Sequence, residues 1–428
     1  MVSIISTARI PAAVCSLTAT SLGSALGSVA THPILRYSGK YCRRHVQLQR
    51  RNEENMPGIF GIVDPAAHGE LRNKAAQKMA QSLLHYPRYQ WAVKQSSAAT
   101  MGVVHLGITS WQQACSVVSS ADGRYQLAFE GELFNVAELQ HALAGDQEED
   151  SMPASPLHFV LHLLIRSGPA ALPRFNGLFQ LAFWDNLKQQ LLLAGDRIGL
   201  RSLYLAHQGE RLAFAPEVKA LLTLPWVSRA IDTNGVMQFL QYGNVLGDRT
   251  FFREVQFLPG GCYAIHHRGR LSIARYWGIN FEGESKLELK TAQERFVELW
   301  QQVIRRQTED VGRLRMGVLL SGGLDSRLIL SGCVAQGRKL PTFTMGDPES
   351  LDVRLAKKTA TAAECRNLFV PIAAESFLQG MERVVYLTDG MFNCFHAKVK
   401  HLLQTAAAAR QMVPAQRSLS VVPRPVCA

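Results

Sequence analysis

The sequence predicts two domains of different fold class, an α+β sandwich followed by an α/β domain with a parallel sheet. Residues 56–277 hold many short strand-like runs and few helical ones, which is typical of an α+β fold. Residues 291–345 alternate helix, strand, helix and strand, which favours parallel strands with crossover helices. A length of 428 residues is enough for two separate cores.

The elements of the first half follow from the spacing of apolar residues. Residues 58–63 form a continuous apolar run and predict a buried strand. In residues 71–84, Leu71, Ala75, Met79 and Leu83 recur at helical spacing and predict an amphipathic helix. Further helices are predicted at 157–166 and 232–242, and further strands at 103–108, 125–129, 177–184, 190–194 and 203–206.

The second half begins after a polar, charged segment at 278–290, which we interpret as a linker. Residues 291–307 predict an amphipathic helix with Phe296 and Trp300 in its core face. Strands are then predicted before residue 321 and at 340–345, with helices at 327–336 and within 373–403. Residues 404–428 have no core periodicity and are expected to form an irregular tail.

The most informative motif is Ser-Gly-Gly-Leu-Asp-Ser at residues 321–326, between a predicted strand and a predicted helix. Gly322 and Gly323 permit positive φ and let the backbone approach an anion, while free N–H groups at the helix start point toward it. Asp325 is placed to cap the helix or to hold a cation beside phosphates. The alternative is an ordinary βα turn. The Walker pattern GxxxxGK[ST] is absent from the sequence.

Charge and composition exclude several classes of protein. The net charge is +12, but residues 1–55 alone carry seven basic and two acidic residues. Because no basic cluster is interleaved with aromatics, nucleic-acid binding is disfavoured. No run of 18 apolar residues predicts a membrane span. The eight cysteines form no CxxC pair, which favours reduced, buried thiols, a cytoplasmic location and no structural zinc.

Residues 1–55 have three interpretations. Residues 1–52 lack acidic residues and are rich in Ala, Ser, Thr and Arg, the composition of a transit peptide. A secretory signal is the second interpretation, although Arg9 and Pro11 interrupt its apolar core. We favour the third, in which Met56 is the functional start and the preceding residues are an extension without a fold.

From Met56 to about Leu403 the chain resembles the glutamine-dependent asparagine synthetase family. The motifs that carry the resemblance are GIFG at 58–61, GELFN at 131–135, FNGLF at 175–179, DRIGLRSLY at 196–204, FAPEVKAL at 214–221, LPGG at 258–261 and SGGLDS at 321–326. The resemblance implies a class II glutaminase sandwich of the Ntn type at 56–277. It also implies a Rossmann-like ATP-pyrophosphatase domain at 291–403.

The resemblance implies an ATP-dependent ligase that adenylates a carboxylate, either aspartate or a peptide or amino-acid derivative, before an amine attacks it. The implied ATP-binding residues are Leu320, Ser321, Gly322, Gly323, Leu324, Asp325, Ser326 and Met345. Asp325 and Asp352 are the acidic candidates near Mg²⁺. The oligomeric state stays open, with a homodimer among the candidates.

The chain departs from the family at its glutamine site. The family begins this domain with a nucleophilic cysteine, and here the position is Pro57, which cannot attack glutamine. His105 replaces a carboxylate-binding arginine, and Glu130 replaces the asparagine before Gly131 and Glu132. No aspartate stands near residues 155–156 where one would bind the substrate amine. These changes predict an inactive glutaminase half.

A second departure is the lack of a Gly-Asp-Glu-rich loop and a catalytic lysine between residues 403 and 428, from which we expect an incomplete ligase domain. Three functional interpretations remain. One is an amide ligase of asparagine synthetase type. Another is an enzyme similar to the β-lactam synthetases or lasso-peptide cyclases, which use an amine within the substrate. A third, of another class, is a non-catalytic remnant or binding module.

Overall fold

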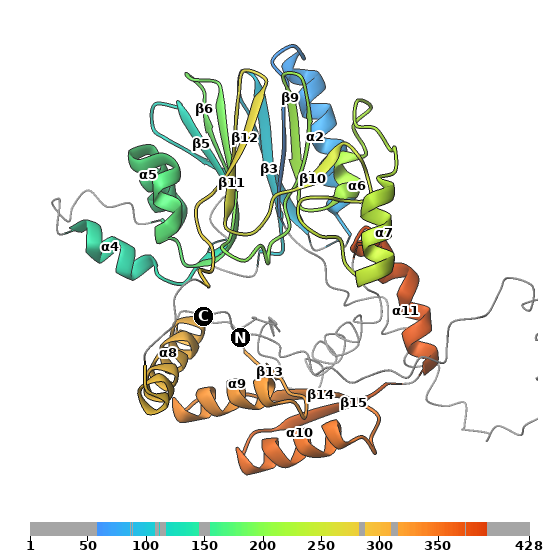
Figure 1. The fold of residues 1–428 in the computed structure, drawn as a ribbon. Helices are drawn as coiled ribbons and strands as arrows, with labels where there is room; N and C mark the ends of the chain where they lie inside the picture. Colours follow the sequence, from blue (N-terminus) through green and yellow to red (C-terminus); the bar gives the residue numbers. More distant parts are fainter. Residues whose placement is uncertain are drawn as a thin grey trace, which may run out of the picture. The chain divides into compact units, whose positions relative to one another are not determined.

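The computed structural model describes residues 58–85, 87, 89–107, 111, 117–144, 155–281, 287–309, 316–372 and 374–391. The first half contains two six-stranded sheets whose neighbouring strands are all antiparallel (Figure 1). The first sheet has the order β10-β8-β9-β1-β3-β2 and the second β12-β11-β7-β6-β5-β4. Their strands are β1 (Gly58–Val63), β2 (Gln90–Gln95), β3 (Ala99–His105), β4 (Val117–Ser119), β5 (Tyr125–Leu133), β6 (Gly177–Asp185), β7 (Gln190–Gly195), β8 (Tyr204–Gln208), β9 (Arg211–Ala215), β10 (Val255–Phe257), β11 (Cys262–His267) and β12 (Arg270–Arg275).

The two sheets pack face to face with helices outside them, as the predicted α+β sandwich requires. Residues of β1, β3 and β9 share one core cluster with residues of β6, β7 and β11, so this cluster lies between the sheets. Helices α2 (Gly69–Leu83) and α6 (Val218–Leu221) cover the outer face of the first sheet. Helix α5 (Pro156–Ser167) covers the second sheet. Outside this core, α4 spans Val136–Ala144 and α7 spans Thr233–Tyr242.

The predicted strands of this half are all present, although several ends differ from the prediction. The strand expected at 103–108 is β3, which begins at Ala99. The one expected at 125–129 is β5, which continues to Leu133 and pairs along its whole length with β6. Short or mixed-polarity strands such as β2, β9, β11 and β12 were not predicted, because their pattern becomes regular only through pairing with neighbours.

Met79 and Leu83 of the predicted apolar face of α2 are buried, but Leu71 at its start is not. Leu71 is 61% exposed, and the neighbouring Arg72 is 3% exposed. The guanidinium of Arg72 donates hydrogen bonds to the backbone carbonyls of Asp64, Ala67, Ser96 and Ser97. A buried charge is tolerated there because it saturates carbonyl groups of two turns.

His266 on β11 should make stability depend on pH. Its ring is 2% exposed, and within the described residues neither ring nitrogen has a hydrogen-bond partner. Burial, together with the charges of His207 and His267, lowers the pKa of His266 from 6.5 to about 4. The unfolded chain therefore takes up the proton first as the pH falls, so the stabilisation present above pH 6.5 is lost between pH 6.5 and about 4.

We expect His266 to contribute a loss of about 2 kcal/mol in unfolding free energy between pH 7 and pH 5. Urea unfolding at both pH values, for the wild type and for His266→Leu, measures this contribution because other titrations are common to the two proteins. An equal pH dependence in the variant would contradict the assignment.

The described part of the second half contains three parallel strands, β13 (Val318–Leu319), β14 (Thr342–Gly346) and β15 (Asn367–Pro371), in that order across the sheet. Helices α9 (Leu324–Ala335) and α10 (Leu351–Ala362) connect them. Helix α8 (Leu289–Glu309) precedes the sheet and α11 (Ala374–Leu387) follows it. The core joins α8, α9, α10 and the strands through side chains such as Ile304, Leu330 and Ala356.

Two expectations about α8 have different outcomes. Trp300 is partly buried and packs against the core cluster of this half. The prediction for Phe296 was wrong, since its side chain is 44% exposed and stacks on Trp300 at 6.2 Å between ring centroids. The expectations for residues 1–57 and 392–428 lie outside the described residues. Among the described helices, none has the length and apolarity to cross a bilayer.

Candidate functional site

The turn at residues 321–326 is held by its two serines. The Ser321 N–H donates to Ser326 Oγ at 3.1 Å, and the Gly323 N–H donates to Ser321 Oγ at 3.2 Å. The two hydroxyl oxygens are 3.0 Å apart, and Ser326 Oγ also donates to the Ser321 carbonyl at 3.1 Å. Both hydroxyls therefore order the backbone just before α9 begins at Leu324.

The positive φ expected for the glycine pair was wrong, and at Gly322 a close approach of α10 requires glycine instead. Neither glycine has positive φ, and Gly323 has φ −67° as the N-cap of α9. A Cβ on Gly322 would lie 2.6 Å from the Asp352 Cα and 2.9 Å from its carbonyl oxygen, whereas on Gly323 it would meet only Ser321 Oγ at 3.2 Å. Gly322 thus lets the first turn of α10 touch the serine turn.

Two helix starts consequently share the carboxyl edge of the parallel sheet. Helix α10 begins after Ser350, whose Oγ accepts the Val353 N–H at 3.4 Å. Met345 lies on β14 two residues past the partner of Leu319, and so at the same edge. Free N–H groups at helix starts attract anions, and ligands of open α/β sheets bind at this edge.

Most of the predicted ATP-binding residues lie at this carboxyl edge of the parallel sheet. Leu320 differs from the others, because its side chain is buried in the core and only its backbone belongs to the turn. Asp325 lies in the first turn of α9, where Gly323 is the N-cap and no side chain caps the helix, so the capping role expected for Asp325 was wrong. Asp325 and Asp352 are both exposed and are the carboxylates of this edge available to a cation.

The described residues at which an altered glutamine site was expected lie on β3 and β5, the strands that pair with β1 and β6. Gln180 on β6 is buried, and its Oε1 accepts the N–H of Ile59 at 3.1 Å. Its amide nitrogen donates to the carbonyl of Ser202. Gln180 is also the cross-strand partner of Glu130. Pro57, which precedes β1, lies outside the described residues.

Glu130 on β5 is a buried carboxylate, 1% exposed. Arg201 Nη1 lies 3.6 Å from Glu130 Oε2. The loop that carries Arg201 is ordered by Asp196, which accepts N–H bonds from Ile198, Leu200 and Arg201 at 3.0–3.1 Å. Burial raises the pKa of Asp196, and these backbone donors oppose the shift. A carboxylate at position 130 cannot donate a hydrogen bond to a developing oxyanion while ionised.

The remaining members of the altered site have structural contacts of their own. His105 ends β3, is buried, and accepts the Gly107 N–H on Nδ1 at 3.1 Å. Burial lowers the pKa of His105, so it is a poor substitute for a permanently charged arginine. Gly131 has φ +120°, and a Cβ there would lie 2.0 Å from the Leu178 carbonyl oxygen. Glu132 is half-buried on β5.

Sequence reasoning did not select Gln180 or Arg201 as site residues. Arg201 lies in the motif at 196–204, and its pairing with Glu130 was hidden because the two residues are distant in sequence. Gln180 carries no signal of its own within an apolar strand.

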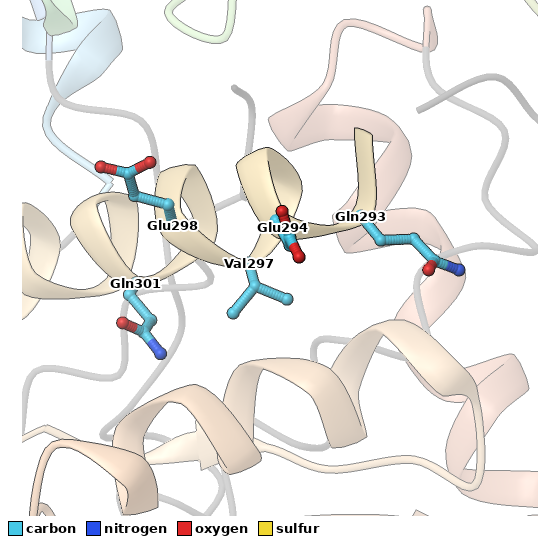
Figure 2. A pocket seen from close by; sticks show the side chains of 5 residues that line it. All are labelled: Gln293, Glu294, Val297, Glu298 and Gln301. Atoms are coloured by element: carbon cyan, nitrogen blue, oxygen red, sulfur yellow. The ribbon is translucent and has the colours of Figure 1, made fainter. Parts of the chain in front are cut away.

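The surface of α8 carries a pocket unrelated to these residues. Its lining consists of Gln293, Glu294, Val297, Glu298 and Gln301, all from α8 (Figure 2). Val297 points away from α8, downward in this view. None of the predicted site residues lines it, and within the described part of the chain no group of three potential metal ligands is assembled.

Two different protein families match successive parts of the chain. Residues 56–277 match the glutamine amidotransferase domain family, and residues 296–413 match the asparagine synthase family. Asparagine synthetase 1 of Bacillus subtilis is 24% identical over 346 residues, covering 78% of this chain and 53% of that protein. Asparagine synthetase 3 of the same organism is 28% identical over 209 residues, covering 48% and 33%.

The chain thus spans about half the length or less of these relatives. The amidotransferase match alone covers more than half of the 428 residues, and it is followed in order by the asparagine synthase match. This order agrees with the motifs from GIFG to SGGLDS. The chain therefore belongs to the asparagine synthetase family, whose members combine a glutamine amidotransferase domain with an ATP-dependent synthase domain.

Proposed function

We propose that this protein is an ATP-dependent carbon–nitrogen ligase that adenylates a small carboxylate and does not hydrolyse glutamine. The observation that carries the proposal is the serine-ordered turn at 321–326, with Gly322 against Asp352 at the carboxyl edge of the sheet. Such a turn offers backbone N–H groups to phosphates. Family membership supports ATP as the nucleotide.

In the proposed reaction, a substrate carboxylate oxygen attacks the α-phosphorus of ATP and pyrophosphate leaves. An amine then attacks the acyl carbon and AMP leaves. The N–H groups of the turn and of the start of α9 would bind the phosphates, and Met345 would contact the adenine. Aspartate is the first candidate carboxylate, and another amino-acid or peptide derivative is the second.

The carboxylates present fit a magnesium ion that arrives with the nucleotide. Mg²⁺ commonly uses one or two protein carboxylates together with phosphate oxygens and water. Asp325 and Asp352 supply two exposed carboxylates beside the turn, which matches this requirement. When bound, the ion would neutralise phosphate charge; the chain's own part is to bind and orient the nucleotide.

ATP–pyrophosphate exchange tests the proposal directly. Labelled pyrophosphate should enter ATP in the presence of aspartate or of one member of a pool of carboxylates, because adenylation is reversible. ATP with Mg²⁺ should also raise the melting temperature through binding to the native state. A folded protein with neither exchange nor a thermal shift would instead support the interpretation as a non-catalytic binding module.

Glutamine hydrolysis should equal the background rate without protein. Pro57 offers no nucleophile, and Glu130 with Arg201 replaces the donor that an oxyanion needs. Glutamate release from glutamine measures the activity, with Glu130→Asn as the variant that restores a donor without restoring a nucleophile. Release above background in both proteins would show that the nucleophile lies elsewhere.

A second candidate function follows from the same altered site. An enzyme that cannot obtain ammonia from glutamine needs another amine. An amine within the substrate would suffice, and the β-lactam synthetases and lasso-peptide cyclases use such an amine. Pro57 and Glu130 favour this over a glutamine-dependent synthetase. Free ammonia and amine-bearing carboxylates, compared in the exchange assay followed by product analysis, separate the two.

A further inference from the structure

A buried polar cluster joins the amidotransferase half to the end of α11. It consists of His85 after α2, Glu217 before α6, Lys219 in α6 and Asp389 after α11. We call these four residues the clamp. The side chains of His85 and Glu217 are each 2% exposed, Asp389 is 9% exposed and Lys219 is 15% exposed.

The clamp residues contact one another in a continuous chain. His85 Nε2 lies 2.8 Å and 3.0 Å from the two carboxylate oxygens of Glu217. Lys219 Nζ pairs with Glu217 and also lies 3.1 Å from Asp389 Oδ1. The Asp389 carboxylate accepts the backbone N–H groups of Val218 at 2.6 Å and Lys219 at 3.3 Å. Asp389 therefore caps α6, although 171 residues separate it from Val218.

Neighbouring residues of the same segment extend the contact. Tyr386 meets His85 edge to face at 5.7 Å between ring centroids, and Lys219 Nζ lies 5.1 Å from the centroid of the Tyr386 ring. Met391 packs against the core cluster formed by α2, α6 and the first sheet. Asp389 adopts φ +54°, a conformation that costs energy for a residue with a side chain unless its surroundings impose it.

Through these contacts the amidotransferase half can have a structural role that does not depend on glutamine hydrolysis. We propose that the clamp fastens Asp389, and that the amidotransferase half thereby serves as a scaffold that positions residues 383–391 of the synthase half. Two carboxylates buried beside one lysine and one histidine are stable only while their partners stay in place, because each unpaired charge would be desolvated. Asp389 and Lys219 are positioning residues in this proposal.

Hydrogen exchange of the full-length protein tests the clamp. Asp389→Asn keeps an oxygen that can accept the N–H groups of α6 and removes the charge, and Lys219→Met removes the cation. Each should raise the exchange rates of amides in residues 383–391 at least about tenfold. The free-energy cost of local opening is smaller in these variants, because no ion pair has to be broken. The double variant should exchange no faster than about the faster single variant, since both changes remove one interaction.

Asp232→Asn is the matched control, because Asp232 also caps a helix and pairs with an arginine, Arg249 at 2.9 Å. It should leave exchange in 383–391 unchanged. If either clamp variant fails to fold, His85→Leu replaces it, since leucine offers no hydrogen bond to Glu217. Exchange in 383–391 that rises no more in the clamp variants than in Asp232→Asn would overturn the proposal.

The consequence for ATP binding rests on the proposed function and is measured separately. In the clamp variants the ATP-induced thermal shift should remain, since the serine turn is not part of the clamp. A wild type without pyrophosphate exchange would defeat the proposed function, and the hydrogen exchange result would still decide the clamp.

Discussion

Gly322→Ala should weaken ATP binding by about 10- to 100-fold, while Gly323→Ala should change it by less than about threefold. The new methyl group at 322 would lie 2.6 Å from the Asp352 Cα and Oδ1, and backbone atoms cannot give way as a flexible side chain can. The serine turn and the start of α10 must therefore move apart. At Gly323 the nearest atom is the rotatable Ser321 Oγ at 3.2 Å, and φ −67° suits alanine.

Calorimetric titration with ATP and Mg²⁺ measures both variants against the wild type. Circular dichroism and the melting temperature must show that Gly322→Ala is folded, because the comparison concerns the site and not the fold. Equal affinities for the two alanine variants would mean that the nucleotide does not use the contact between the turn and α10.

Arg72→Met should lower the free energy of unfolding by about 3–5 kcal/mol, a large effect for a single side chain. Arg72 is 3% exposed, and its guanidinium serves the carbonyls of Asp64, Ala67, Ser96 and Ser97. Methionine fills similar space but donates no hydrogen bond, so four carbonyl groups around the buried side chain lose their donor. The turns after β1 and β2 are then no longer linked through hydrogen bonds to one side chain.

Lys74→Met is the control on the same helix. Lys74 pairs with Glu70 at 2.8 Å, but its side chain is 63% exposed, and such pairs contribute less than about 0.5 kcal/mol. Urea unfolding followed by the fluorescence of Trp184, which is buried between the sheets, reports on this half of the protein. A loss below about 1 kcal/mol for Arg72→Met would show that water can replace the guanidinium at these carbonyls.

Much of the fold could be predicted because its elements carry regular apolar patterns. The strand at 58–63 and the helices α5, α7 and α8 match their predicted ranges within two residues. The family was also predicted correctly, since its motifs occur in order from GIFG to SGGLDS. These features are local, so neighbouring residues are sufficient to reveal them.

The candidate site was predicted less completely. The turn at 321–326 was found from its residues, but the positive φ expected for its glycines was wrong, and the close contact of Gly322 with Asp352 depends on the packing of α10. Arg201 beside Glu130 was not predicted, since the partners lie 71 residues apart on different elements. The capping of α6 by Asp389 was not predicted either, since 171 residues separate Asp389 from Val218.

The sequence by itself determined the order of the two halves, the family, the serine motif at 321–326 and the presence of proline at position 57. Each of these is a property of residue identity or of short-range spacing. Only the tertiary structure decided that Arg72 rather than Leu71 is buried, that Gly322 admits no methyl group, and that His85, Glu217, Lys219 and Asp389 form one cluster. The physical reason is that burial of a charge or close contact of backbones depends on partners supplied by distant segments, and an individual stretch of sequence does not contain them.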